Sequence, residues 1–116
     1  MDIKISGKVI RGDGYGRKIG FPTVNLEIEN NNAKEIPKEG VYAGLGILEG
    51  KEYNAGIVVG PKIENKPKVE AHLLGYSGDA YGKEVTLRIN KFLRVYKKFD
   101  TEEELIAQIK KDLQLC

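Results

Sequence analysis

Hydrophobic and polar residues alternate along most of the chain, as in β-strands that bury one face. Ile3 and Ile5 alternate with Lys4 and Ser6, and other stretches repeat this period of two. Turn-forming residues separate these stretches, for example at 30–32, 37–40 and 77–79. The pattern predicts strands over residues 3–10, 23–28, 41–48, 52–59, 68–75 and 83–95.

The last part of the chain changes to a helical period. Its apolar residues are spaced to share one face of a helix over residues 101–113: Leu105, Ile106, Ile109 and Leu113. Thr101 and Glu104 have the spacing of a capping box, and acidic residues fill the expected first turn. We therefore expect an all-β fold with one C-terminal helix. So many strands in a short chain favour a small barrel, because closure removes exposed strand edges.

The length, charge and cysteine content of the chain limit the classes of protein to which it can belong. A length of 116 residues fits a single domain over residues 1–116. The net charge of +2 and the lack of tryptophan argue against a nucleic-acid partner. Cys116 is the only cysteine, so no disulfide can form within the chain. Because no disulfide can form within the chain, we expect a reducing compartment, the cytoplasm. Because the chain has no long apolar run, we expect a soluble protein without a membrane partner. We also expect a monomer.

The segment over residues 12–26, GDGYGRKIGFPTVNL, is the most unusual part of the sequence. It contains four glycines, Gly12, Gly14, Gly16 and Gly20. It is not a P-loop, and Arg17 stands where a dinucleotide-binding motif would need glycine. Backbone N–H groups of such a loop can bind an anion, and Arg17 and Lys18 add positive charge beside it. The glycines alone favour a simpler alternative, a plain turn leading straight into a strand.

Two polar residues that follow this loop favour a binding site over a plain turn. Thr23 and Asn25 are two residues apart in an expected strand, so their side chains share one face. Hydroxyl and amide oxygens suit Mg²⁺, which usually combines a few protein ligands with substrate phosphates and water. The alternative is the ordinary solvent face of an edge strand.

Residues 12–26 resemble the G-x-G-R-G-x…G-x-P-T-A-N motif of the riboflavin kinase family, which includes the kinase module of bacterial bifunctional FAD synthetases. Further segments resemble this family in the same order. They are GVYA at 40–43, VEAHLL at 69–74, DAYGK at 79–83, FLR at 92–94 and KFD at 98–100. The resemblance extends over nearly the whole chain, from about residue 7 to 113.

The resemblance implies a six-stranded antiparallel barrel of Greek-key type with a C-terminal helix. It also implies transfer of the γ-phosphoryl group of ATP to the 5′-hydroxyl of riboflavin, which gives FMN and ADP. The implied nucleotide-binding residues are Gly12, Gly14, Gly16, Arg17, Lys18, Thr23 and Asn25. Thr23 and Asn25 would also hold Mg²⁺. Glu70 would be the catalytic base, and Arg94 and Phe99 would border the flavin.

The residue pattern alone also makes Glu70 a candidate functional residue. It lies in mid-strand on the face opposite Val69 and Ala71, where a buried charge would need a partner. A solvent-facing glutamate is the alternative. His72 shares its face and is expected to be a hydrogen-bonded structural residue, and Asp79 and Tyr81 are expected to form a turn. For the whole chain, the alternatives to a kinase are a non-catalytic flavin- or nucleotide-binding barrel and, less favoured by the charge, a barrel that binds single-stranded nucleic acid.

Overall fold

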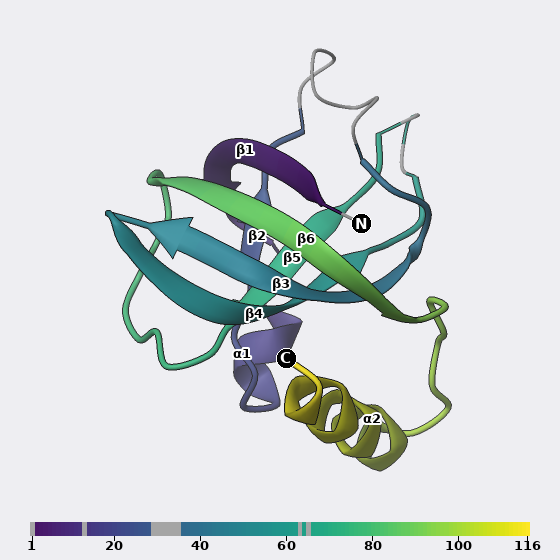
Figure 1. The fold of residues 1–116 in the computed structure, drawn as a ribbon. Coiled ribbons are helices and arrows are strands. Elements are labelled where there is room, and N and C mark those ends of the chain that lie inside the picture. The colour runs from purple at the N-terminus through teal and green to yellow at the C-terminus, as the bar shows by residue number, and fades with distance from the viewer. Residues whose placement is uncertain (1, 13, 29–35, 63, 65) are drawn as a thin grey trace.

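The computed structural model describes residues 2–12, 14–28, 36–62, 64 and 66–116. The expected turn at 30–32 lies outside these residues. Figure 1 shows the strands and helices in chain order. The strands are β1 (Ile3–Ile10), β2 (Val24–Leu26), β3 (Gly40–Leu48), β4 (Lys51–Val59), β5 (Val69–Leu73) and β6 (Glu84–Arg94). The helices are α1 (Tyr15–Lys18) and α2 (Glu102–Gln114).

The strands form a closed barrel in the order β1-β2-β5-β4-β3-β6, and every neighbouring pair is antiparallel. The expected all-β barrel with a C-terminal helix is therefore confirmed. Closure places β2 between β1 and β5, so segments from the first and the second half of the chain meet there. This junction positions the candidate site.

Alternate residues of the strands fill the barrel. The side chains packed in this core include Ile5, Val9, Leu26, Tyr42, Ile57, Val69, Ala71, Leu87 and Ile89. The Tyr42 hydroxyl donates a hydrogen bond to the carbonyl of Lys38 at 2.6 Å, and burial raises the pKa of Tyr42. Because inward and outward positions alternate, Asn25 and Glu70 point away from this core.

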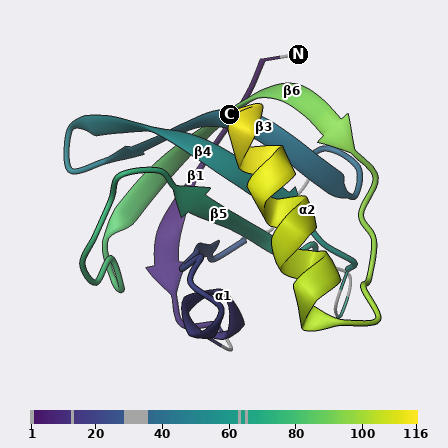
Figure 2. The ribbon, with the colours of Figure 1, turned by 90° about the horizontal axis from the view of Figure 1, so that it is seen from below.

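Helix α2 packs on the outside of the barrel, against β3 and β4 (Figure 2). Thr101 is its N-cap, and the Thr101 hydroxyl accepts a hydrogen bond from the Glu104 N–H at 3.2 Å, as the sequence predicted. Gly56 lets the helix approach, since a Cβ there would lie 3.0 Å from Leu113 Cδ2. Within the described residues, no helix is long and apolar enough to span a membrane.

The glycine-rich segment is not the plain loop that we expected. It contains the helical turn α1, closed by hydrogen bonds from the Lys18 N–H to the Gly14 carbonyl and from the Phe21 N–H to the Gly16 carbonyl. Gly14 and Gly20 flank this turn with φ of +74° and +95°. Glycine adopts such left-handed conformations without a steric penalty, so these two residues let the chain enter and leave the turn sharply.

Candidate functional site

A cavity of about 610 Å³ opens beside α1, where the end of β1 meets the start of β2. One wall is the glycine-rich segment with Gly12, Gly14 and Arg17. Thr23 and Asn25 come from β2 and the residues just before it. The turn over residues 76–81, which precedes β6, also lines the cavity. The cavity therefore brings together five of the expected nucleotide-binding residues.

Asn25 carries an unusual feature in this cavity. Its Oδ1 is buried, and no hydrogen-bond donor among the described residues reaches it. A buried polar atom without a partner costs about 1–3 kcal/mol, so a ligand that supplies a partner is favoured here. Thr23 lines the same cavity.

The residues at this corner fit a divalent cation of the Mg²⁺ type. Asn25 Oδ1 is a hard oxygen ligand in need of a partner, and Thr23 offers a hydroxyl. No cluster of three or more His, Cys, Asp or Glu residues that could hold a metal ion is found within the described part of the chain. A cation at this corner would therefore draw its remaining ligands from water and from the phosphates of a substrate.

Gly12 has a specific steric role. A Cβ at this position would lie 2.4 Å from Asn25 Nδ2 and 2.9 Å from Asn25 Oδ1, closer than side-chain atoms can approach. The group that approaches the backbone here is thus the Asn25 side chain. Gly16 is similarly required, since its Cβ would lie 2.5 Å from the Phe21 carbonyl oxygen. Gly16 shapes α1 without lining the cavity, and Lys18 is exposed outside the lining.

Glu70 lies next to this corner on the neighbouring strand. It is the direct cross-strand partner of Asn25 in the β2–β5 ladder. Cβ atoms of such pairs are about 4.5–5.5 Å apart, so the two side chains are neighbours on the outer face. Glu70 is not part of the cavity lining. Its side chain is 28% exposed, and its Oε2 lies 3.9 Å from Lys68 Nζ.

His72 acts as a structural residue, as its pattern suggested. Its Nδ1 lies 2.7 Å from the Pro22 carbonyl oxygen, which can only accept, so Nδ1 carries the proton. Phe21 packs edge-on against the imidazole with the ring centres 5.9 Å apart. These contacts fix the backbone just before Thr23, which lines the cavity.

The sequence pattern did not identify the turn over residues 76–81 as part of the cavity. Tyr76, Asp79 and Tyr81 line it, although Asp79 and Tyr81 were expected only to form a turn. That turn is present, because the Asp79 Oδ1 accepts the Tyr81 N–H at 2.9 Å. Arg11 was missed as well, although a cation directly before Gly12 was a usable signal.

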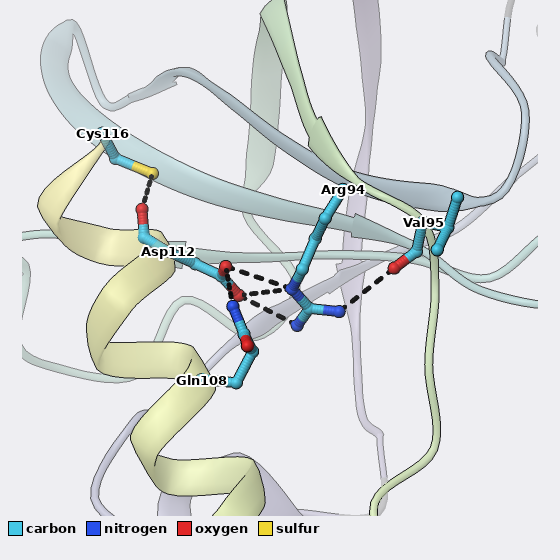
Figure 3. Close-up of polar contacts among 5 residues, drawn as sticks. All are labelled: Arg94, Val95, Gln108, Asp112 and Cys116. Carbon is cyan, nitrogen blue, oxygen red and sulfur yellow. Dashed lines mark hydrogen bonds and ion pairs between the residues drawn. The ribbon is translucent and has the colours of Figure 1, made fainter.

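Arg94 and Phe99 lie outside this cavity, near α2. The Arg94 guanidinium donates to the Asp112 carboxylate at 2.9–3.1 Å (Figure 3). It also lies 5.6 Å from the centre of the Phe99 ring. Burial raises the pKa of the Cys116 thiol, and the Asp112 charge acts in the same direction, so this thiol donates to the Asp112 carbonyl. The flavin contacts expected for Arg94 and Phe99 stay a prediction.

Comparison with known proteins agrees with the fold and shows the family. The family model described as Flavokinase, riboflavin kinase, matches residues 1–116. The chain is 36% identical over 116 residues to the bifunctional riboflavin kinase/FMN adenylyltransferase of Bacillus subtilis, which covers 95% of this chain and 36% of that protein. The Escherichia coli K12 protein of the same name is 37% identical over 115 residues, with 93% and 35% covered. The chain thus spans about a third of the length of these curated relatives.

A solved structure of riboflavin kinase from Trypanosoma brucei is also similar. It superposes with a TM-score of 0.79 at 25% sequence identity. The match covers 98% of this chain and 76% of the other. The similarity therefore extends over the barrel and the C-terminal helix together.

Proposed function

Since the chain belongs to the riboflavin kinase family, we propose that it transfers the γ-phosphoryl group of ATP to the 5′-hydroxyl of riboflavin, giving FMN and ADP. The observation that carries this proposal is the buried Oδ1 of Asn25, which has no hydrogen-bond partner among the described residues, in a glycine-walled cavity. The presence of Thr23 and Glu70 beside it favours a kinase over a non-catalytic barrel.

The cavity is suited to the polyphosphate of the nucleotide. Gly14 leaves the backbone open for close approach, and Arg17 adds a positive charge to the wall. Thr23 and Asn25 would hold Mg²⁺, which when bound neutralises charge on the phosphates and orients them. Phosphoryl transfer depends mainly on such positioning and charge neutralisation, so a small barrel can supply what the reaction needs.

The acceptor alcohol would lie on the Glu70 side of the same corner. Glu70 faces outward beside Asn25, so its carboxylate can accept the hydroxyl proton while the phosphoryl group leaves the nucleotide. The ring of riboflavin would then extend toward α2, where Arg94 and Phe99 lie. Both ends of the proposed reaction thus use the outer face of β2 and β5.

One assay tests the proposal directly. The protein is incubated with riboflavin, Mg²⁺ and each of the four ribonucleoside triphosphates, and FMN is separated by chromatography. We expect FMN with ATP. A protein that binds riboflavin or ATP and forms no FMN with any donor would instead be a non-catalytic barrel.

Asn25→Ala should weaken binding of Mg-ATP by about 10–100-fold, because a ligand to the metal–phosphate unit contributes roughly what a hydrogen bond to a charged group does, about 1.5–3 kcal/mol. The melting temperature should change little, since the substitution removes a buried acceptor without a partner. Calorimetric titration with Mg-ATP measures the affinity. Asn54→Ala, an exposed strand asparagine, is the control, and equal affinities of the two variants would remove Asn25 from the site.

Gly12→Ala should raise the KM for Mg-ATP about tenfold or more, because the new Cβ displaces the Asn25 side chain. The effect should be absent when Asn25 is already alanine, since both substitutions then act on the same contact. Steady-state kinetics of the single and double variants measure this coupling. Gly60→Ala, whose Cβ would make only ordinary contacts from 3.8 Å, is the control. Additive losses would show that Gly12 acts through the fold.

A further inference from the structure

Arg11 and Tyr81 are in contact at the cavity. Arg11 follows the end of β1, and Tyr81 belongs to the turn before β6 that also lines the cavity. The guanidinium carbon of Arg11 lies 4.3 Å from the centre of the Tyr81 ring. This distance is within the range of a cation–π contact. The contact therefore joins two lining segments that are about seventy residues apart in the sequence.

The arginines of this chain fall into two groups. Arg88 Nη2 lies 3.6 Å from Asp2 Oδ1, and Arg94 Nη2 lies 2.9 Å from Asp112 Oδ2. Neither Arg88 nor Arg94 lines the cavity. Arg11 and Arg17 line the cavity, and within the described segments neither has a carboxylate partner. Two arginines without an ion pair among the described residues thus line the cavity, together with one carboxylate, Asp79, where the polyphosphate would lie.

The contact with Tyr81 suits the Arg11 guanidinium to bind an anion. Arg11 has several N–H donors, and a guanidinium that lies over an aromatic ring can still donate to phosphate oxygens. The ring also limits the side-chain entropy that Arg11 would lose when a phosphate binds. A lysine in this position would lack the paired donors.

Hydrogen bonds hold the backbone on both sides of Tyr81 in place. The Tyr81 N–H donates to Asp79 Oδ1 at 2.9 Å on one side of the turn. On the other side, the Gly82 N–H donates to the Val9 carbonyl at 2.9 Å, which ties the turn to β1. The strand that leads to Arg11 and the turn that carries Tyr81 are therefore directly bonded to each other.

We propose that Arg11 is a phosphate-binding residue for the polyphosphate of the nucleotide, and that Tyr81 is a positioning residue that presents the Arg11 guanidinium to it. The identity of the ligand rests on the proposed function. The phosphate contact itself requires only an anion in the cavity. Charge-assisted, paired N–H donors are the interaction that Arg11 supplies.

The test uses calorimetric titration with Mg-ATP and with Mg-tripolyphosphate, which lacks the nucleoside. Arg11→Gln should weaken both ligands by about 10–100-fold, as expected for loss of a charge-assisted hydrogen bond. Tyr81→Leu should weaken both about threefold in the wild-type background and have no effect when Arg11 is already glutamine. Lys8→Gln removes an exposed cation of β1, the strand that leads to Arg11, outside the cavity and should change neither affinity. Melting temperatures show whether each variant is folded.

Three results would overturn the inference: an Arg11→Gln affinity within twofold of Lys8→Gln, a loss confined to Mg-ATP, or a Tyr81→Leu effect that persists without Arg11. Failure of the wild type to bind tripolyphosphate would overturn it as well. The FMN assay separates this outcome from the proposed function. Tripolyphosphate binding that depends on Arg11, in a protein that forms no FMN, would support the phosphate contact and contradict the kinase.

Discussion

Replacing Glu70 with glutamine should slow FMN formation by about 10²–10⁴-fold while riboflavin and Mg-ATP still bind, because general-base assistance contributes an effect of this size. This corresponds to roughly 3–5 kcal/mol of activation free energy at about 1.4 kcal/mol for each tenfold change. Glutamine keeps the size of the side chain and removes its basicity. A loose transition state needs less help from a base and would place the loss at the low end. Single-turnover formation of FMN at saturating substrates measures the effect.

The fold should tolerate this substitution. The Lys68–Glu70 ion pair is long at 3.9 Å and partly exposed, and such pairs contribute about 0–1 kcal/mol. Glu52→Gln, an exposed strand carboxylate outside the site, is the matched control. A Glu70→Gln rate equal to that of Glu52→Gln would eliminate Glu70 as the base. A large fall in melting temperature would instead assign Glu70 to the fold.

The strands could be predicted closely because the barrel imposes a strict alternation on the sequence. Residues 3–10 were expected and form β1, and the bounds of β3, β4 and β6 differ by one residue at each end at most. β2 and β5 are shorter than expected. Gly75 has φ of +84°, so the chain turns there, soon after β5 ends at Leu73. Periodicity locates buried faces well, but backbone turns decide where a strand ends.

Helix α1 could not be predicted from periodicity. It is four residues long, lies between two left-handed glycines and contains Gly16, which disfavours helix. The hydrogen bond from the Phe21 N–H to the Gly16 carbonyl helps to define this segment, and a sequence does not show that contact.

The sequence could predict one part of the candidate site, because the residues of that part are close together in the chain. Gly12, Thr23 and Asn25 are close in the sequence, so one motif indicated them together. The wall over residues 76–81 joins them only because the barrel closes β1, β2 and β5 side by side. Likewise, no local pattern shows that Arg94 is bound to Asp112, eighteen residues further along.

Asp112→Ala should destabilise the protein by about 3 kcal/mol, because removing one partner of a buried ion pair leaves the other charge uncompensated, at a cost of about 3–5 kcal/mol. Asp112 is 6% exposed and accepts hydrogen bonds from Arg94 and from Gln108 Nε2 at 2.9 Å. The Arg94 side chain is 22% exposed, so water offsets part of the loss and the low end applies. This is a large fraction of the total stability of a small domain, about 5–15 kcal/mol. Urea denaturation of the variant and wild type measures the difference.

The same variant should also affect the flavin more than the nucleotide. Asp112 fixes the Arg94 guanidinium beside Phe99 and ties α2 to the end of β6, whereas the cavity with Asn25 lies elsewhere. We therefore expect the KM for riboflavin to rise more than the KM for Mg-ATP. Asp2→Ala is the matched control, because it breaks the exposed pair with Arg88, for which about 0–1 kcal/mol is expected. If Asp112→Ala costs no more than Asp2→Ala, the pair does not hold α2. If both KM values rise equally, the helix does not shape the flavin side of the site, and the predicted roles of Arg94 and Phe99 fail with it.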